Sequence, residues 1–421
     1  MWRRTFLSLL LVVALLPFIP QELFGNSNAI KFKTKSGMKA WRFNLTSQAL
    51  PPAVKGSVVY TSGGSHSFVV YALKAETGEV IWEHRTNDDG PTSPVATEEY
   101  VAYTTFSCTV DVLEAETGEV LWSRWLAATL YSLPTIGEKN LYVSYTKPTQ
   151  GSPNRIEAYE LKSGQVLWQA PIDAEVLSAP ILDNGYLYAT TEKGTLYRLN
   201  GKTGQEMWHY KGGVIAAPYI KDNKVYITQS GHINEIAGFG STAEITLNPV
   251  QVINWLNVKT GTLAFDITPD VGLQNHRYLV PMGKRRFFNF AGTRPMAIED
   301  IVVAPSPSGL LAISKSDGQV RWCHELETRY LTRFNEPAVS PTAYAGGKCF
   351  TGTRDGRLLC ISPKDGSVLW QEKVGAPIQH EPIVAKGRIY LTVRNCLFCL
   401  DTGDETIDGW PMWGGSPSHN R

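Results

Sequence analysis

The sequence predicts an all-β fold, an eight-bladed β-propeller whose blades are four-stranded antiparallel sheets. Three observations lead to this prediction. A phrase of a small or acidic residue, a glycine, three further residues and an aromatic residue recurs along the chain. A proline before a short apolar run recurs the same number of times. Between these two markers lie short runs rich in Val, Tyr and Thr, and such self-similarity at a regular period is the signature of a repeat architecture.

The phrase supplies the outer edge of each predicted blade. Its tryptophans are Trp41, Trp82, Trp122, Trp168, Trp208, Trp322 and Trp370, and Phe265 takes the place in one further copy. Its glycines from the second copy onward are Gly78, Gly118, Gly164, Gly204, Gly261, Gly318 and Gly366. Glycine provides the positive φ that a hairpin turn needs. Tryptophan is large enough to fill the wedge that opens between radiating blades, so we interpret these residues as the structural repeat.

One repeat, residues 93–122, contains four strand-like runs separated by turn residues. A lone four-stranded sheet cannot bury both faces, so successive sheets must stack around an axis. The innermost strands are predicted to open at Pro52, Pro94, Pro134, Pro180, Pro218, Pro281, Pro341 and Pro382. Proline lacks an N–H donor and therefore suits the first residue of a strand or an edge that faces the axial channel. Both markers count eight blades.

The order of the markers predicts how the ring closes. The chain begins with an outer-strand phrase, whereas its last repeat has only three strands and ends near Leu400. We therefore predict that residues 39–44 form the outer strand of the last blade, which removes a free sheet edge. The C-terminal segment competes for that place, because Asp401, Thr402 and Gly403 can also begin an outer strand.

The chain divides into three predicted parts: residues 1–29, 30–400 and 401–421. Residues 1–29 begin with Arg3 and Arg4 and continue as a short apolar run, which is typical of a secretory signal peptide. An uncleaved anchor is the alternative. Residues 30–400 form the single propeller, and 401–421 are a C-terminal tail. We expect a periplasmic or secreted protein with no transmembrane segment after cleavage.

Charge and cysteine content narrow the function classes. The net charge of +1, from 40 basic and 39 acidic residues, provides no attraction to nucleic acid, which we exclude as a partner. Cys349 and Cys360 flank a predicted hairpin turn, and both a disulfide and two buried thiols remain open. Cys396 and Cys399 lie three residues apart on a predicted strand, so we expect their side chains to face opposite ways, which argues against a redox pair.

The departures from the repeat predict the binding surface. Long interruptions occupy residues 147–154, 230–249, 266–278 and 324–336, and the predicted topology places all of them on one face. Loops on rigid scaffolds often carry function. The candidate partner-binding residues there are His232, Asn234, Glu235, His276, Arg277, Arg329 and Arg333. Residues 285–300, with a small basic and aromatic patch, are predicted to leave the sixth blade by the opposite face.

The phrase and the residues before it, Leu73 to Trp82, resemble the repeat of the pyrroloquinoline-quinone-type eight-bladed propellers, whose fold is that of quinoprotein alcohol dehydrogenases. The resemblance covers about residues 35–400, and residues 410–421 resemble a tail of secreted bacterial propellers of this kind. That superfamily includes quinoprotein dehydrogenases and non-enzymatic relatives, notably the periplasmic scaffold of the outer-membrane β-barrel assembly machinery.

The resemblance does not carry the enzyme chemistry with it. Quinoprotein dehydrogenases hold pyrroloquinoline quinone with calcium beside a pair of adjacent cysteines and use an aspartate base. This chain has no adjacent cysteines, and no residue can be assigned as a calcium ligand or as the base. The sequence therefore predicts no catalytic residue, no metal site and no bound cofactor.

We expect an exported, monomeric, non-enzymatic scaffold that binds protein or peptide partners in the cell envelope. Two alternatives stay open. One is an oxidoreductase that uses pyrroloquinoline quinone with calcium. The other is a sensor that binds a carbohydrate or another small ligand in the axial channel.

Overall fold

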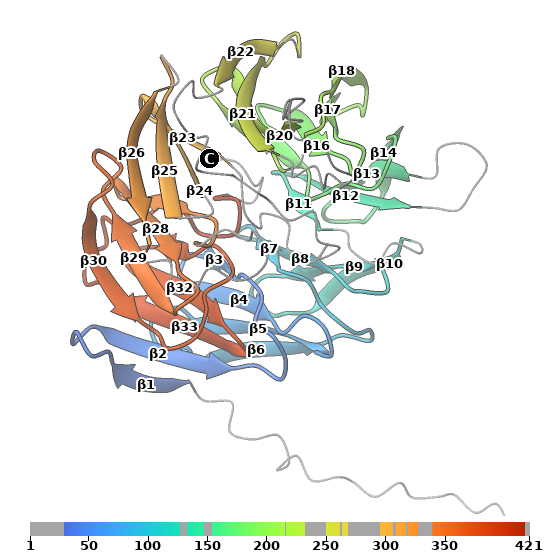
Figure 1. The fold of residues 1–421 in the computed structure, drawn as a ribbon. Coiled ribbons are helices and arrows are strands. Elements are labelled where there is room, and N and C mark those ends of the chain that lie inside the picture. Colours follow the sequence, from blue (N-terminus) through green and yellow to red (C-terminus); the bar gives the residue numbers. More distant parts are fainter. Residues whose placement is uncertain are drawn as a thin grey trace, which may run out of the picture.

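The computed structural model describes residues 29–126, 133–146, 154–214, 216–231, 250–261, 263–267, 295–305, 309–316, 319–326 and 339–416. Within these ranges the regular elements are strands, which form antiparallel sheets arranged around a central axis as a β-propeller (Figure 1). None of the described residues forms a helix that is long and apolar enough to cross a membrane.

Seven of the sheets in the described residues have four strands, and we number them blades 1 to 7 in chain order. Blade 1 contains β3 (Ala53–Lys55), β4 (Val58–Ser62), β5 (Val69–Lys74) and β6 (Val80–Arg85). Blade 2 contains β7 (Val95–Ala96), β8 (Tyr100–Thr104), β9 (Thr109–Glu114) and β10 (Val120–Trp125). Blade 3 contains β11 (Thr135–Ile136), β12 (Asn140–Thr146), β13 (Asn154–Glu160) and β14 (Val166–Pro171).

Blades 4 to 7 repeat this plan. Blade 4 contains β15 (Ile181–Asp183), β16 (Tyr186–Thr190), β17 (Thr195–Asn200) and β18 (Glu206–Lys211). Blade 5 contains β19 (Tyr219–Lys221), β20 (Lys224–Gly231), β21 (Val250–Asn257) and β22 (Leu263–Ile267). Blade 6 contains β23 (Met296–Ile298), β24 (Ile301–Pro305), β25 (Gly309–Ser314) and β26 (Val320–Glu325). Blade 7 contains β27 (Ala343–Ala345), β28 (Lys348–Gly352), β29 (Arg357–Ile361) and β30 (Val368–Lys373).

The remaining sheet joins both ends of the chain, and we call it the closing sheet. From the axis outward it contains β31 (Ile383–Ala385), β32 (Arg388–Val393), β33 (Cys396–Asp401), β2 (Lys39–Asn44) and β1 (Ile30–Lys33). The pairing of β2 with β33 runs from Lys39 opposite Asp401 to Asn44 opposite Cys396. The predicted ring closure by residues 39–44 is confirmed, whereas β1 was not anticipated. The expectation of uniform four-stranded blades therefore holds for seven described sheets, and the closing sheet has five strands.

The proline marker locates most innermost strands. These strands begin directly after the predicted proline in blades 1 to 5 and in the closing sheet, and two residues after Pro341 in blade 7. The prediction for Pro281 is wrong, because the innermost strand of blade 6 begins after Pro295. A three-residue strand is too short to be distinguished by pattern from the apolar run around Pro281, which misled the interpretation.

The repeated phrase forms the contact between one sheet and the next. Gly118 has a φ of +75°, and a Cβ at this position would lie 2.6 Å from Cδ2 of Trp82 in the preceding blade. The Trp82 indole donates a hydrogen bond to the Ala115 carbonyl at 3.1 Å. The same packing joins Trp41 to Gly78, Trp122 to Gly164, Trp168 to Gly204, Trp208 to Gly261 and Trp322 to Gly366. Each of these glycines provides both a left-handed turn and room for the neighbouring indole.

A row of tyrosines on the second strands reinforces these junctions. The Tyr60 hydroxyl donates to the Ala115 carbonyl at 3.1 Å, the same oxygen that accepts from Trp82. In blade 3, Tyr142 and Trp168 likewise both donate to the Gly201 carbonyl, at 3.1 and 3.0 Å. The sequence analysis missed this row, although an aromatic third residue recurs in the second strands.

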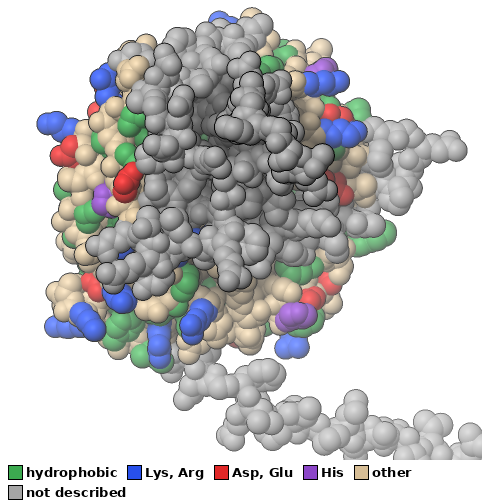
Figure 2. Space-filling model, viewed as in Figure 1, with side chains coloured by type: hydrophobic (Ala, Val, Ile, Leu, Met, Phe, Trp, Pro, Cys, Tyr) green, Lys and Arg blue, Asp and Glu red, His purple; other side chains and the backbone are tan. Residues whose placement is uncertain are grey.

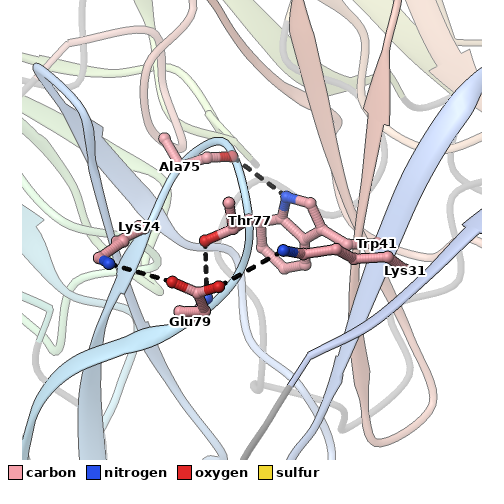
Figure 3. Close-up of polar contacts among 6 residues, drawn as sticks. All are labelled: Lys31, Trp41, Lys74, Ala75, Thr77 and Glu79. Atoms are coloured by element: carbon pink, nitrogen blue, oxygen red, sulfur yellow. Dashed lines mark hydrogen bonds and ion pairs between the residues drawn. The ribbon is translucent and has the colours of Figure 1, made fainter.

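Figure 3 shows the junction between the closing sheet and blade 1. The Trp41 indole donates to the Ala75 carbonyl at 3.1 Å. The Glu79 carboxylate lies between the ammonium groups of Lys74, at 3.0 Å, and Lys31, at 3.4 Å. Hydrogen bonds from these two lysines lower the pKa of Glu79. Exposed ion pairs of this kind stabilise little, so the backbone ladder with β2 is the main attachment of β1.

The junction between blade 7 and the closing sheet departs from the pattern. Apart from the adjacent residues of the chain, no atom of the described residues lies within 4 Å of the position that a Cβ would take at Gly37 or at Gly403. Trp370 keeps the contact with an aromatic residue of its own blade that Trp82, Trp168 and Trp208 also make, since its ring centroid lies 6.1 Å from that of Phe350. A hydrogen bond from the Ser36 hydroxyl to the buried Glu372 carboxylate links the two sheets instead.

The C-terminal tail closes the ring a second time, from the inside. Trp410 and Val384 of β31 exchange backbone hydrogen bonds of 2.8 and 2.7 Å, and Val54 of β3 donates to the Pro411 carbonyl at 2.6 Å. The Trp410 indole is only 2% exposed and donates to the Glu381 carboxylate at 3.2 Å. The competing expectation, that this segment forms an outer strand, is therefore wrong. An apolar tail finds more burial at the ring's inner edge than a free outer edge offers.

The cysteines in the described residues are free. Cys349 lies opposite Ile361 and Phe350 lies opposite Cys360, so the two thiols face opposite sides of their sheet. Burial raises the pKa of each to about 12. The alternative of two buried thiols is the one that the register supports.

Candidate functional site

The strand order gives the propeller two unlike faces. In each blade, the turn between the second and third strands and the connection to the next sheet emerge on the same face, which we call the connection face. Its described residues include 45–52, 86–94, 105–108, 374–382 and 394–395. The opposite face, the hairpin face, carries the short turns between first and second strands and between third and fourth strands, such as 115–119 and 161–165.

The long interruptions predicted from the sequence leave from strand ends on the connection face. They lie between β12 and β13, between β20 and β21, between β22 and β23, and between β26 and β27. The candidate partner-binding residues His232, Asn234, Glu235, His276, Arg277, Arg329 and Arg333 belong to these connections and lie outside the described residues.

The expectation that residues 285–300 leave by the opposite face is wrong. Since β23 begins at Met296 and β24 at Ile301, the residues before Pro295 belong to the connection between β22 and β23. That connection begins and ends on the connection face. The error follows from the misplaced innermost strand of blade 6, which shifted the predicted strand order by one turn.

The described part of the connection face contains a cavity of about 550 Å³, which we call the seam pocket. It lies where the closing sheet meets the connections to blade 1 and from blade 7. The lining residues are Ser47, Gln48, Ala49, Pro377, Gln379, His380, Thr392, Arg394 and Asn395. Its volume lies in the range of cavities that enclose small ligands, about 300–1,000 Å³.

Backbone hydrogen bonds hold the rim of the seam pocket in place. The Leu45 amide donates to the Asn395 carbonyl at 2.7 Å, and the Ala49 amide donates to the Arg394 carbonyl at 2.8 Å. The Asn395 side-chain amide returns a hydrogen bond to the Leu45 carbonyl at 3.3 Å. Arg394 has a φ of +56°, in the left-handed region. The pocket therefore has a preformed wall made from both ends of the chain.

The seam pocket contains one buried titratable group, His380, which is 7% exposed. Its Nδ1 shares a 2.7 Å hydrogen bond with the Thr392 hydroxyl. Burial lowers the pKa of His380 to about 4, so the imidazole is neutral at pH 7 and is a weak base. Among the lining side chains, Arg394 thus carries the formal charge at neutral pH.

The chemistry of the pocket favours binding over catalysis. The Ser47 hydroxyl donates to the Ser65 carbonyl, so the proton of this potential nucleophile is already engaged. In the part of the chain that the structure describes, no group of three or more His, Cys, Asp or Glu side chains is placed to hold a metal ion. On the described rim of the molecule, basic and acidic side chains are interspersed, in keeping with the net charge of +1 (Figure 2).

Sequence reasoning missed the seam pocket because its parts are far apart in the chain. Ser47 and Arg394 meet only because residues 39–44 close the ring against the last repeat. The one available signal was that predicted closure, which implies that the segments just after it share a face. Nothing in the pattern singles out the residues themselves.

Comparisons of the sequence and of the fold with known proteins both point to the outer membrane protein assembly factor BamB. A family model described as outer membrane protein assembly factor BamB matches residues 26–175, 107–239, 152–335 and 307–407. Outer membrane protein assembly factor BamB of Vibrio cholerae is 30% identical over 128 residues, which cover 28% of this chain and 32% of that protein. The matched stretch is thus about a third of the length of this curated relative.

Solved structures extend the likeness of fold to most of the chain. The crystal structure of BamB from Moraxella catarrhalis has a TM-score of 0.62 at 15% identity and covers 88% of this chain and 100% of that one. Quinohemoprotein alcohol dehydrogenase from Comamonas testosteroni has a TM-score of 0.58 at 16% identity and covers 87% of this chain and 76% of that one. At such identities both similarities concern the fold alone.

Proposed function

Because the chain belongs to the family of the outer membrane protein assembly factor BamB, we propose that it is an exported, non-enzymatic scaffold that binds protein partners in the cell envelope. The observation that carries this proposal is the asymmetry of the ring. The long connections and the seam pocket share the connection face, whereas the hairpin face has short turns. A rigid scaffold with long loops on one face is suited to partner binding.

The proposal includes the partners and the location. The relatives are named as assembly factors of the outer membrane, so we propose proteins of outer-membrane assembly as partners. Residues 1–29 would direct a monomeric chain to the periplasm, 30–400 would be the propeller and 401–421 its tail. In this proposal the five-stranded closing sheet is the eighth blade.

The test is partner capture by the full-length chain in its own host. Alanine substitution of His232, Asn234, Glu235, His276, Arg277, Arg329 and Arg333 is expected to reduce the envelope proteins that co-purify with the tagged chain. The matched control replaces Glu116, Lys162 and Lys202, which are exposed on hairpin-face turns. Equal capture by both variants and the unmodified chain would remove the connection face from the proposal.

The oxidoreductase alternative has its own test. The purified chain is titrated with pyrroloquinoline quinone and calcium, and dye-linked oxidation of alcohols is measured. Saturable binding with turnover would replace the scaffold proposal. A channel-binding sensor would have to accommodate its ligand beside Trp410 and Pro411, which bond to β31 and β3. Saturable binding of a sugar that protects these residues would support it.

A further inference from the structure

We infer that the seam pocket binds the carboxylate at the C-terminal end of an extended peptide. This inference specifies the partner chemistry of the proposed connection face and rests on that proposal, but its test needs no partner. The pocket has the three features that a chain-end receptor requires: one cation, polar groups around it and an apolar contact for the last side chain.

The cation is Arg394. Its side chain is exposed at the rim, and none of the ion pairs among the described residues involves it. With His380 neutral, the lining carries one positive charge and no negative one. A guanidinium binds a carboxylate through two parallel hydrogen bonds, which fix the orientation of the carboxylate and also neutralise its charge.

The polar groups around Arg394 come from three segments. Gln48 and Gln379 are exposed at opposite connections, and each carries an amide that can donate to one ligand oxygen and accept from a peptide N–H. The Asn395 amide is held by its bond to Leu45. The backbone bonds that fix this rim exist without a ligand, so little ordering cost remains when one binds.

The apolar contact and the shape favour a chain end. Pro377 is exposed among the polar lining and provides apolar surface for one side chain, whereas Ala49 is fully buried. Because the connections from β2 and from β30 and the turn after β32 all contribute lining residues, we expect a peptide that ends in the cavity to meet fewer obstructions than one that passes through it. A phosphate group is less well matched, since it is bound by clusters of arginines, and a neutral sugar does not require Arg394.

The experiment measures binding of three fluorescent peptides to the full-length chain by anisotropy at pH 7. The first carries the fluorophore on its N-terminus and consists of three alanines and a terminal leucine with a free carboxylate. The second is the same peptide with an amidated end. The third is amidated and has one glutamate in place of its central alanine. Only the first is expected to bind saturably, and its affinity should exceed that of the others at least tenfold.

Two variants assign the site. R394Q is expected to weaken the free-acid peptide about tenfold or more, because one charge-assisted pair is lost. R85Q, which removes an exposed arginine from β6, should leave the affinity unchanged. Both variants should keep the unfolding transition of the natural chain.

Three results would overturn the inference. They are no binding of the free-acid peptide at millimolar concentration, equal affinity for acid and amide, or an R394Q variant that binds as the natural chain does. Equal binding of the glutamate peptide would replace the chain end by an internal acidic side chain. If the peptide binds but connection-face alanines leave partner capture intact, the proposed function fails while the pocket chemistry stands.

Discussion

Neighbouring sheets are joined differently at the junction between blades 1 and 2 and at the seam around the closing sheet. Between blades 1 and 2, the Trp82 indole rests on Gly118 and donates to the Ala115 carbonyl, with Tyr60 donating to the same oxygen. At the seam, the glycine of the phrase, Gly37, has no such neighbour within 4 Å. There the sheets are joined by the pairing of β2 with β33 and by the C-terminal tail, and a polar cavity lies beside them.

The regular junctions specify the fold, whereas the seam has side chains that are available to bind a ligand. In a regular junction the indole packs directly on the glycine of the next sheet. The seam is held by strands and hydrogen bonds from both ends of the chain. The connections there therefore need not fill the space between neighbouring sheets. The pocket with Arg394 lies there.

The largest effect is expected at the inner closure. Trp410 is 2% exposed, and truncation of a buried tryptophan to alanine costs about 3–5 kcal/mol. W410A is therefore expected to lower the free energy of unfolding by about 4 kcal/mol in urea titrations. Trp125, which is 69% exposed, is the control, and W125A should cost less than about 1 kcal/mol. Equal losses would mean that the tail is an appendage and not part of the seam.

The second effect contrasts a regular junction with the seam directly. G118A places a Cβ 2.6 Å from the Trp82 ring at a φ of +75°. Backbone strain of about 1–2 kcal/mol and overpacking of about 1–3 kcal/mol add to an expected loss of about 3 kcal/mol. G37A has a φ of +92° and open space, so only the strain of about 1 kcal/mol applies. If urea midpoints shift equally for both, the indole contact is not what distinguishes the junctions.

The third effect is a pH dependence at the seam. His380 has a folded pKa of about 4, lowered by burial, against about 6.5 in an unfolded chain. Between these values the unfolded state binds more protons, so stability is full above pH 6.5 and is lost as the pH falls toward 4. The loss at pH 5.5 is about 1 kcal/mol relative to pH 7.

The variant H380N tests that assignment. It keeps a polar group beside Thr392 but does not titrate in this range. The difference in unfolding free energy between pH 7 and pH 5.5 should therefore shrink by about 1 kcal/mol relative to the natural chain. An unchanged pH dependence in H380N would assign the acid sensitivity to another group.

The smallest effect on stability is expected at Arg394. Its side chain is exposed, so R394Q should change the unfolding free energy by less than about 0.5 kcal/mol. Its effect on peptide binding should nevertheless be large. A loss of stability that matches the loss of binding would make Arg394 a structural residue of the seam.

The repeat allowed the regular part of the fold to be predicted, and the reasons are physical. Tryptophan and glycine at a fixed spacing serve one role at each junction, so Trp82 and Gly118 could be read from the chain. The innermost strands have only two or three residues in several blades, too few for a periodic pattern, and Pro281 was misassigned for that reason.

The seam could be predicted only in outline. Residues 39–44 were recognised because they carry a copy of the phrase. The strand β1 carries none, and the place of Trp410 depends on tertiary contacts with β31 and β3. The pocket residues share no motif, because Ser47, Gln379 and Arg394 meet only after the ring has closed.

The most direct test of the account is to place a photoreactive amino acid at one position of the full-length chain in its host and identify the cross-linked proteins. Gln379 on the connection face and Glu116 on the hairpin face are the matched positions, since both are exposed. We predict a defined cross-link to an envelope protein from Gln379, reduced in the R394Q background, and none from Glu116. Cross-linking to the same protein from Glu116 but not from Gln379 would contradict it.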